Sequence, residues 1–242
     1  MMDFEGAAML ALWNGVTAER QAEYDLWHTR EHVPQRLGVP GIRGARRYTR
    51  LRGPMPEYLT LYDVDRIEVF ESAPYRYLID NPTPWSRSMR PSFEGFFRLC
   101  CDRLLTVGGG MGCVAAEITF DDDFDIRAPD MLRFLGEMGR VPGITAIHAI
   151  RTDRSVAGMP FAIGGAKPAF PDGGALILES YGATELDQAL ERFRAAAADT
   201  ISAEKWASLT TYSLAYAIEK PSLERVVTIG PDAVADAGLV SE

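Results

Sequence analysis

The order of strand-like and helix-like segments along these 242 residues predicts an α+β protein built from two tandem copies of a β-α-β-β-α-β unit. Three observations lead to this prediction. The six segments of one unit precede a run of glycines at 108–110, which is typical of a linker. The same order of segments follows those glycines. The sequence Val-Pro-Gly-Ile occurs at 39–42 and again at 141–144, at the same helix-to-strand junction of each copy.

In the first copy, we expect strands over 7–14, 42–51, 58–64 and 96–107, and helices over 18–37 and 66–79. Thr17 is a residue type that caps helix N-termini, and Pro40-Gly41 is a turn signal before the second strand. Tyrosine and threonine alternate with leucine over 58–64, which is the period-2 pattern of a strand. Pro74 is expected to break the second helix, which ends near Asn81.

The second copy is expected to contain strands over 113–120, 144–152, 175–181 and 208–218, and helices over 129–138 and 185–198. A Gly/Pro-rich loop separates its second and third strands. We therefore divide the chain into a first repeat at 1–107 that holds the candidate site, a supporting second repeat at 108–220, and a C-terminal tail at 221–242.

Each β-α-β-β-α-β unit forms a four-stranded antiparallel sheet with both helices on one face. The other face of the sheet then needs cover, and a tandem copy supplies a second sheet in the same polypeptide. We expect the two sheets to pack together with the helices outside. A cavity between helices and sheet is expected in each half.

Composition restricts the classes of partner. The net charge is −9 and the pI is about 5.0, which argues against nucleic acid as a partner. No apolar run approaches the ~20 residues that cross a membrane, so no membrane association is expected. The N-terminal residues lack a basic region followed by an apolar one, and we therefore expect a cytoplasmic protein without a secretory signal.

The three cysteines are Cys100, Cys101 and Cys113, and an odd number with two adjacent members is not a disulfide framework. We expect buried thiols in a reducing compartment. Because successive residues of a strand face opposite ways, Cys100 and Cys101 should lie on opposite faces of their strand.

The segment Trp-His-Thr-Arg-Glu-His over 27–32 concentrates candidate site residues on the first predicted helix. His32 is the candidate general acid or base, because imidazole titrates near neutral pH, and Glu31 is its candidate tuning partner. Trp27 and His28 are candidates for binding the substrate. His28, Glu31 and His32 also match an inverted zinc-peptidase pattern, but nothing nearby supplies a third ligand, and we predict no metal.

The second strand adds arginines and a tyrosine. Its alternation places Arg47 on one face with Arg43 and Ala45, and Arg46 on the other face with Tyr48. An arginine fork suits a substrate carboxylate. Arg46, Arg47 and Tyr48 are therefore candidates, and the sequence leaves open which arginine faces the cavity.

An aromatic and proline-rich segment follows the second helix. Prolines make the segment Asn-Pro-Thr-Pro-Trp over 81–85 rigid, so that Asn81, Thr83 and Trp85 are candidates for the wall of an aromatic site. Tyr62 on the third strand is a further candidate for contacting the substrate. The competing interpretation of each tyrosine is core packing.

This element order resembles the dimeric α+β barrel superfamily, and within it EthD-like proteins. The side-chain resemblance rests on Trp27-x-x-x-Glu31-His32 and on Pro40-Gly41-Ile42. It implies two ferredoxin-like repeats that form an intramolecular dimeric α+β barrel. It also implies a functional Glu-His pair, which falls on Glu31 and His32. The corresponding helix of the second repeat has no histidine or tryptophan, so one working site is expected, in the first repeat.

The superfamily includes isomerases, polyketide cyclases, cofactor-free monooxygenases and haem enzymes, so the fold does not determine the chemistry. We expect a cofactor-independent lyase or isomerase that decarboxylates, or transfers a proton on, a small aromatic or polyketide-like acid. The alternatives are a cofactor-free monooxygenase, a haem enzyme and a non-catalytic small-molecule binding protein. Pairing with a further copy of the chain remains open.

Overall fold

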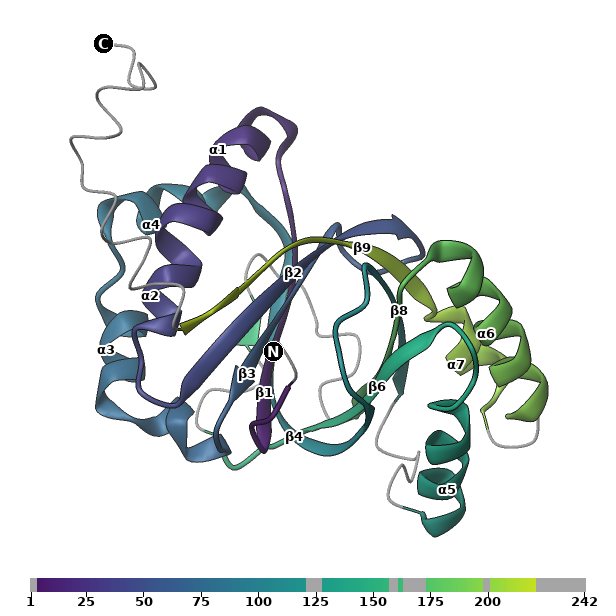
Figure 1. Ribbon diagram of the computed structural model, residues 1–242. Helices are drawn as coiled ribbons and strands as arrows, with labels where there is room; N and C mark the ends of the chain where they lie inside the picture. The colour runs from purple at the N-terminus through teal and green to yellow at the C-terminus, as the bar shows by residue number, and fades with distance from the viewer. Residues whose placement is uncertain (1–3, 121–127, 157–160, 163–172, 198–200, 221–242) are drawn as a thin grey trace.

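Eight strands form one closed antiparallel barrel, with helices on its outside (Figure 1). The structure is a computed structural model that describes residues 4–120, 128–156, 161–162, 173–197 and 201–220. The predicted tail at 221–242 and most of the Gly/Pro-rich loop lie outside the described residues. The predicted α+β fold of two tandem ferredoxin-like repeats is confirmed.

The first repeat consists of β1 (Ala8–Val16), α1 (Gln21–Trp27), α2 (Val33–Leu37), β2 (Ile42–Arg52), β3 (Tyr58–Val64), α3 (Ala73–Asp80), α4 (Pro84–Met89) and β4 (Phe93–Gly108). The second consists of β5 (Val114–Phe120), α5 (Pro129–Met138), β6 (Ile144–Thr152), β8 (Gly174–Ser180), α6 (Ala183–Ala196), α7 (Ala203–Ala207) and β9 (Thr210–Glu219). The short β7 (Phe161–Ala162) pairs with β4.

The sheets join edge to edge in addition to facing each other. The strand order is β4-β1-β3-β2 in the first repeat and β9-β5-β8-β6 in the second, and the pairs β2–β9 and β4–β6 close the barrel. This closure agrees with the expected intramolecular barrel of two repeats. Closure leaves no open edge on these eight strands, which removes a site of unwanted strand pairing.

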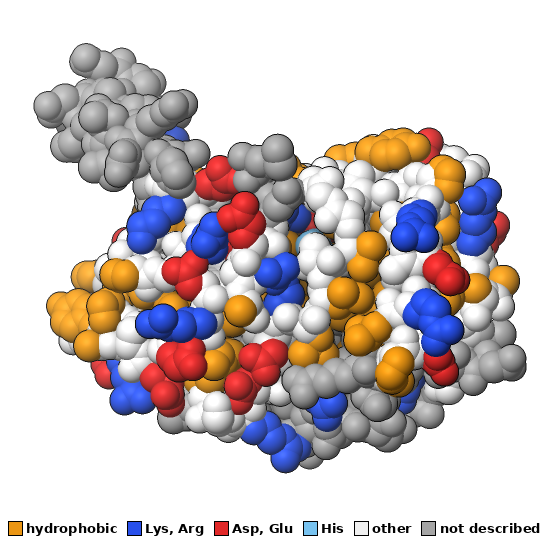
Figure 2. All heavy atoms as spheres, turned by 60° about the horizontal axis from the view of Figure 1, so that its bottom comes forward, with side chains coloured by type: hydrophobic (Ala, Val, Ile, Leu, Met, Phe, Trp, Pro, Cys, Tyr) orange, Lys and Arg blue, Asp and Glu red, His pale blue; other side chains and the backbone are white. Residues whose placement is uncertain are grey.

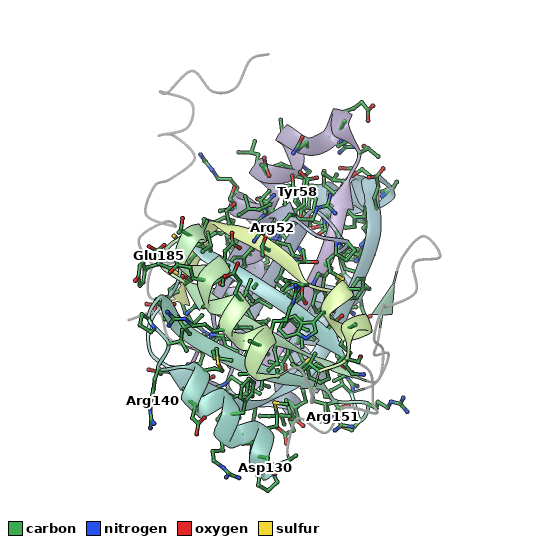
Figure 3. The ribbon with its side chains drawn as sticks, turned by 90° about the vertical axis from the view of Figure 1, so that its right-hand side faces the viewer. Arg52, Tyr58, Asp130, Arg140, Arg151 and Glu185 are labelled. Atoms are coloured by element: carbon green, nitrogen blue, oxygen red, sulfur yellow. The ribbon has the colours of Figure 1, made fainter. Side chains whose placement is uncertain are left out.

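Helices of the two repeats cover opposite sides of the barrel. Helices α1 to α4 lie on one side and α5 to α7 on the other (Figure 1). Figure 3 views the second group, in which α5, beginning near Asp130, and α6, which contains Glu185, lie across the strands. The barrel interior is a separate core to which both repeats contribute, among others Trp13, Leu59 and Ile177.

The predicted helix over 18–37 is not uniform. It begins as a 3-10 turn, η1 (Ala18–Arg20), and Thr17 makes no side-chain cap bond. Between α1 and α2 lies a π-helical segment, η2 (His28–His32), which covers the sequence motif singled out above. Because π-turns are uncommon and are often found at functional sites, this irregularity makes η2 a candidate part of the functional site.

Two further boundaries differ from the predictions. The second helix divides at Ser72 into a 3-10 turn, η3 (Ile67–Glu71), and α3, whose first turn is capped by the Ser72 hydroxyl. The proline-rich segment at 81–85 leads directly into a helix, α4, because the Thr83 side chain accepts from the Ser86 amide and Pro84 occupies the first helical position.

Side chains of β2 and β4 alternate between the two faces of the sheet, and a bulge interrupts this alternation in β2. A register shift between Ile42 and Gly44 puts Ile42 on the outer face, with the first-repeat helices, although the sequence pattern placed it with Arg46. In β4, Cys100 faces those helices and Cys101 faces the barrel interior, which confirms the prediction of opposite faces.

The barrel interior also contains buried charge. Arg46 from the first repeat forms an ion pair with Glu179 from the second, and Glu179 also lies 3.3 Å from His148 Nε2 and accepts from the Gly112 amide at 2.7 Å. Glu117 accepts from Trp13 Nε1 at 3.0 Å, and burial raises the pKa of its carboxyl to about 7. These polar contacts join the two repeats at the centre of the molecule.

The surface is mixed in charge. On the described part of the face in Figure 2, acidic and basic side chains are interspersed among apolar ones. Within the described ranges, no helix combines the length and apolar character that a membrane span requires.

The repeated Val-Pro-Gly-Ile places a glycine at the same strained position in each repeat. Gly41 has φ +92° and Gly143 has φ +101°. A Cβ atom would approach Val69 Cγ2 to 2.5 Å at Gly41 and Glu185 Cβ to 2.7 Å at Gly143. The glycines therefore serve both the turn and its packing against the next helical segment.

We expect Gly41→Ala and Gly143→Ala each to lower the free energy of unfolding by about 1–3 kcal/mol, because alanine resists positive φ and also meets these neighbours. Urea unfolding measures the change. Gly136→Ala in α5 is the control: nothing lies within 4 Å of its Cβ position, and it should stabilise the protein by about 0.5–1 kcal/mol. Equal effects at all three glycines would contradict the assignment.

Glu117 should make stability fall as pH rises. In the unfolded chain its carboxyl releases its proton near its ordinary pKa of 4.5, whereas the folded protein retains the proton up to about pH 7. Between these values the folded state binds more protons, so its relative stability decreases with pH. Compared with Glu117→Gln, the wild type should lose on the order of 3 kcal/mol of unfolding free energy between about pH 4 and pH 8. If the unfolding free energies of the wild type and Glu117→Gln changed with pH in parallel, the raised pKa of Glu117 would be refuted.

Candidate functional site

A cavity of about 240 Å³ lies between the outer face of the first-repeat sheet and helices α1 to α4. Its floor includes Leu10 and Leu12 of β1 and Thr60 and Tyr62 of β3, and Phe93 and Phe96 of β4 add aromatic surface. The helices contribute its polar groups. The volume lies just below the ~300–1,000 Å³ usual for small-molecule sites, so the cavity suits a small ligand.

His28 is buried and held by oxygen atoms on both sides of its ring. Its Nδ1 lies 2.7 Å from the Tyr216 hydroxyl, and its Nε2 lies 3.2 Å from the Thr60 hydroxyl. Burial, and then the nearby charge of Arg47, hold the pKa of His28 well below its usual range. His28 is therefore a neutral, fixed part of the cavity wall. Tyr216 belongs to β9, so the second repeat contributes directly to this wall.

His32 is half-buried and faces the cavity. Its ring centroid lies 4.5 Å from that of Trp27 and 5.5 Å from that of His28. The described residues offer His32 no hydrogen bond. Burial is the main cause that holds its pKa well below the usual range, and the charge of Arg36 adds to the effect, followed by smaller contributions from His28, Arg98 and Arg90. A neutral imidazole with access to the cavity is suited to accept a proton.

Glu31 holds the wall around His32 and makes no hydrogen bond to the imidazole. Its carboxylate accepts from Trp27 Nε1 at 3.1 Å, from the Thr83 hydroxyl at 2.6 Å and from the Ser86 hydroxyl at 3.0 Å. These bonds connect η2 to α4 and fix Trp27 against His32. Adjacent residues of a helix point in directions about 100° apart, so the sequence did not require Glu31 and His32 to touch. The partners of Glu31 are Trp27, Thr83 and Ser86.

Three arginines line the cavity: Arg36, Arg90 and Arg98. Arg36 lies one helical turn after His32, and its guanidinium is 5.7 Å from the ring centroid of Tyr75. Burial lowers the pKa of Arg36. No Asp or Glu is among the described lining residues, so the charged side chains of the cavity lining are arginines.

The two candidate arginines of β2 occupy opposite sides of the sheet, and neither lines the cavity. Arg47 faces the helices, pairs with Asp25 at 2.5 Å and lies over the rings of Tyr24 and Tyr58. Arg46 faces the barrel interior. Tyr48 shares that interior position, and its hydroxyl donates to Glu179 at 3.2 Å. The structure thus separates Arg46 and Tyr48 from His32.

Some of the remaining candidates line the cavity and others do not. Trp27, His28 and Tyr62 line the cavity with His32. Thr83 does not line the cavity, but it contacts the lining residue Ser86 and donates to Glu31. Asn81 donates to the Tyr77 carbonyl and Trp85 donates to Glu23 at 3.0 Å, and neither is among the lining residues.

Sequence reasoning missed Arg36, Arg90, Arg98, Tyr75 and Tyr216. Arg36 had a usable signal, since it follows His32 by four residues and so shares a helix face with it. Tyr216 had none, because β9 reaches the first repeat only through closure of the barrel.

The zinc-peptidase pattern does not assemble. The His28 ring contacts Tyr216 and Thr60, whereas Glu31 points to α4. Nor do His, Cys, Asp and Glu side chains form any group of three able to hold a metal within the described part of the chain.

No protein-family model and no curated protein sequence matches the chain. Solved structures do share its architecture. An anthrone oxidase-like protein aligns with TM-score 0.61 and 14% identity, over 90% of this chain and 96% of that one. A protein assigned as a monooxygenase from Fusobacterium nucleatum subsp. nucleatum ATCC 25586 aligns with TM-score 0.57 and 11% identity, over 89% and 96%.

A third structure, from Lactobacillus acidophilus NCFM and also assigned as a monooxygenase, aligns with TM-score 0.50 and 6% identity, over 88% of this chain and 94% of that one. Identities this low establish the fold alone. The expected fold is confirmed: the chain has the dimeric α+β barrel fold, with both ferredoxin-like repeats in a single polypeptide.

Proposed function

We propose that the first-repeat cavity binds a small aromatic acid and catalyses cofactor-independent proton transfer on it, as an isomerase or a decarboxylating lyase. One observation carries the proposal. His32, a neutral imidazole, faces a small cavity whose wall contains three arginines and, among its described residues, no carboxylate. A base beside fixed positive charge favours reactions that develop negative charge on the substrate.

In the isomerase reaction, neutral His32 removes a proton from a carbon next to an unsaturated group. The electron pair of that C–H bond passes into the conjugated system and onto its oxygen as an enolate or phenolate. The arginines stabilise this anion, and His32 returns the proton to a different carbon. Trp27 supports the imidazole through its ring contact, and Glu31 positions Trp27.

In the decarboxylase reaction, protonated His32 donates to a ring or alkene carbon. The bond to the carboxylate carbon then breaks, its electron pair restores the double bond, and carbon dioxide leaves. No net oxidation occurs in either reaction. Both assign His32 to proton transfer and the arginines to charge stabilisation. They assign no direct role to Arg46 or Tyr48, which lie inside the barrel.

A cofactor-free monooxygenase is the second candidate, and the similar structures favour it. The neighbours above are an anthrone oxidase-like protein and two proteins assigned as monooxygenases. The first step is shared, since proton removal from a phenolic substrate yields the electron-rich anion that reacts with dioxygen. A haem enzyme fits this cavity less well. The haem macrocycle is larger than the cavity of about 240 Å³ that the described residues enclose.

His32→Gln should lower turnover steeply. The test is mass spectrometry of phenolic and cinnamate-like acids incubated with purified protein and no added cofactor. We expect loss of carbon dioxide or an isomer of unchanged mass, reduced by about 10²–10⁴-fold in the variant, as for loss of a general acid or base. Arg30→Gln, an exposed position on the same segment, is the control and should retain activity.

Three other outcomes have defined meanings. Incorporation of an oxygen atom that requires dioxygen would support the monooxygenase. Turnover unaffected by His32→Gln would contradict the mechanism. Saturable binding without any product would indicate a binding protein.

The rate should depend on pH through His32 acting as a base in the free enzyme. Because its pKa is held well below 6.5, the imidazole remains neutral near pH 7 and becomes protonated only in more acidic solution. For the isomerase, kcat/KM should be level around neutral pH and fall on the acid side with an apparent pKa clearly below 6.5. An acid limb centred at or above 6.5 would refute a depressed base.

A further inference from the structure

We propose that four side chains of the cavity bind the carboxylate of a single-ring aromatic acid. They are Arg36, Arg98, Tyr62 and Tyr75. This inference rests on the proposed function of the same cavity and specifies what the cavity recognises. It replaces the arginines of β2, which the sequence had suggested for this task.

Two buried hydroxyl groups in the cavity wall have no partner. Tyr62 is 0% exposed and Tyr75 is 2% exposed, and neither hydroxyl has a hydrogen-bond partner among the described residues. Burial of an unpaired O–H is unfavourable and uncommon in folded proteins. Because both residues line the cavity, an acceptor oxygen of a ligand there can pair with them.

Positive charge is concentrated around the same two tyrosines. The Arg36 guanidinium lies 5.7 Å from the Tyr75 ring centroid, and the charges of Arg36 and Arg98 both act on Tyr75. Arg36 also acts on Tyr62. The repulsion of Arg98 and Arg90 is among the causes that lower the pKa of Arg36, after its burial.

The chemistry of these groups defines the ligand. Guanidinium groups only donate hydrogen bonds, and the two hydroxyls are available to donate, so the matching group is an anion with more than one acceptor oxygen. Apolar surface from Leu12, Phe93 and Phe96 completes the cavity and suits a flat ring. A carboxylate on one aromatic ring satisfies both requirements and the small volume.

Such an anion should also alter His32. The charged or titratable groups around His32 are His28, Glu31, Arg36, Arg90, Arg98, Tyr62 and Tyr75. Of these, Glu31 is engaged by Trp27, Thr83 and Ser86. A carboxylate beside Arg36 and Arg98 offsets their effect on His32, so binding should be accompanied by proton uptake. This change favours the protonated form of His32, which decarboxylation needs.

Calorimetric titration with benzoate, and with benzamide as its uncharged analogue, tests the subsite. We expect benzoate to bind the wild type at least about tenfold more tightly than benzamide. Tyr75→Phe and Arg36→Gln should each weaken benzoate binding about tenfold, as loss of a charge-assisted hydrogen bond does. Repeating the titration in buffers of different ionisation enthalpy should reveal proton uptake with benzoate, absent in His32→Gln.

Matched controls come from the same helices. Tyr77→Phe on α3, where the side chain is 65% exposed, and Arg87→Gln on α4, also exposed, should change benzoate affinity by less than about twofold. Thermal unfolding without ligand separates binding from folding: Tyr75→Phe removes an unpaired buried hydroxyl, so it should be at least as stable as the wild type.

The proposal is overturned if benzoate fails to bind, if benzamide binds equally well, or if Tyr75→Phe binds benzoate as Tyr77→Phe does. Benzoate binding with the expected effects but no turnover of any aromatic acid would retain the subsite and remove the proposed catalysis. Turnover that is insensitive to Tyr75→Phe and Arg36→Gln would retain catalysis and remove the subsite.

Discussion

Closure of the barrel by the β2–β9 and β4–β6 pairs is the constraint on which the rest of the structure depends. It fixes one face of every strand toward an interior shared by both repeats, and it directs the other face toward the helices. It also brings β9 beside β2, where Tyr216 contacts His28. The second repeat, which has no Trp-His motif of its own, thus takes part in the first repeat's cavity.

The two faces of the sheet have different electrostatics. Inside the barrel, Arg46 pairs with Glu179, and Glu117 accepts hydrogen bonds from Trp13 and Tyr212. In the cavity outside, arginines and unpaired phenol groups adjoin neutral histidines, and the described lining has no acidic residue. The interior network joins the repeats, whereas the arginine-lined cavity, with its two unpaired phenol groups, is suited to a negatively charged ligand.

The sequence predicted the element order, the repeat and the helix that carries the motif, because hydrophobic period and turn residues are local signals. The recurring glycines, Gly41 and Gly143, mark equivalent turns in both repeats. The roles of β2 side chains were beyond such signals. The alternation of the strand separated Arg46 from Arg47. Closure of the barrel pairs Arg46 with Glu179, and the helices outside the barrel pair Arg47 with Asp25, so neither arginine lines the cavity. Arg98 and Tyr75 come from elements distant in sequence from His32.

The central claim is that His32 is a neutral base in a positively charged cavity. Nuclear magnetic resonance of its ring protons as a function of pH, in the ligand-free protein, tests it most directly. The account predicts a midpoint clearly below 6.5, which shifts upward in Arg36→Gln because one of the repelling charges has been removed. A midpoint at or above 6.5, unchanged by that substitution, would contradict the account.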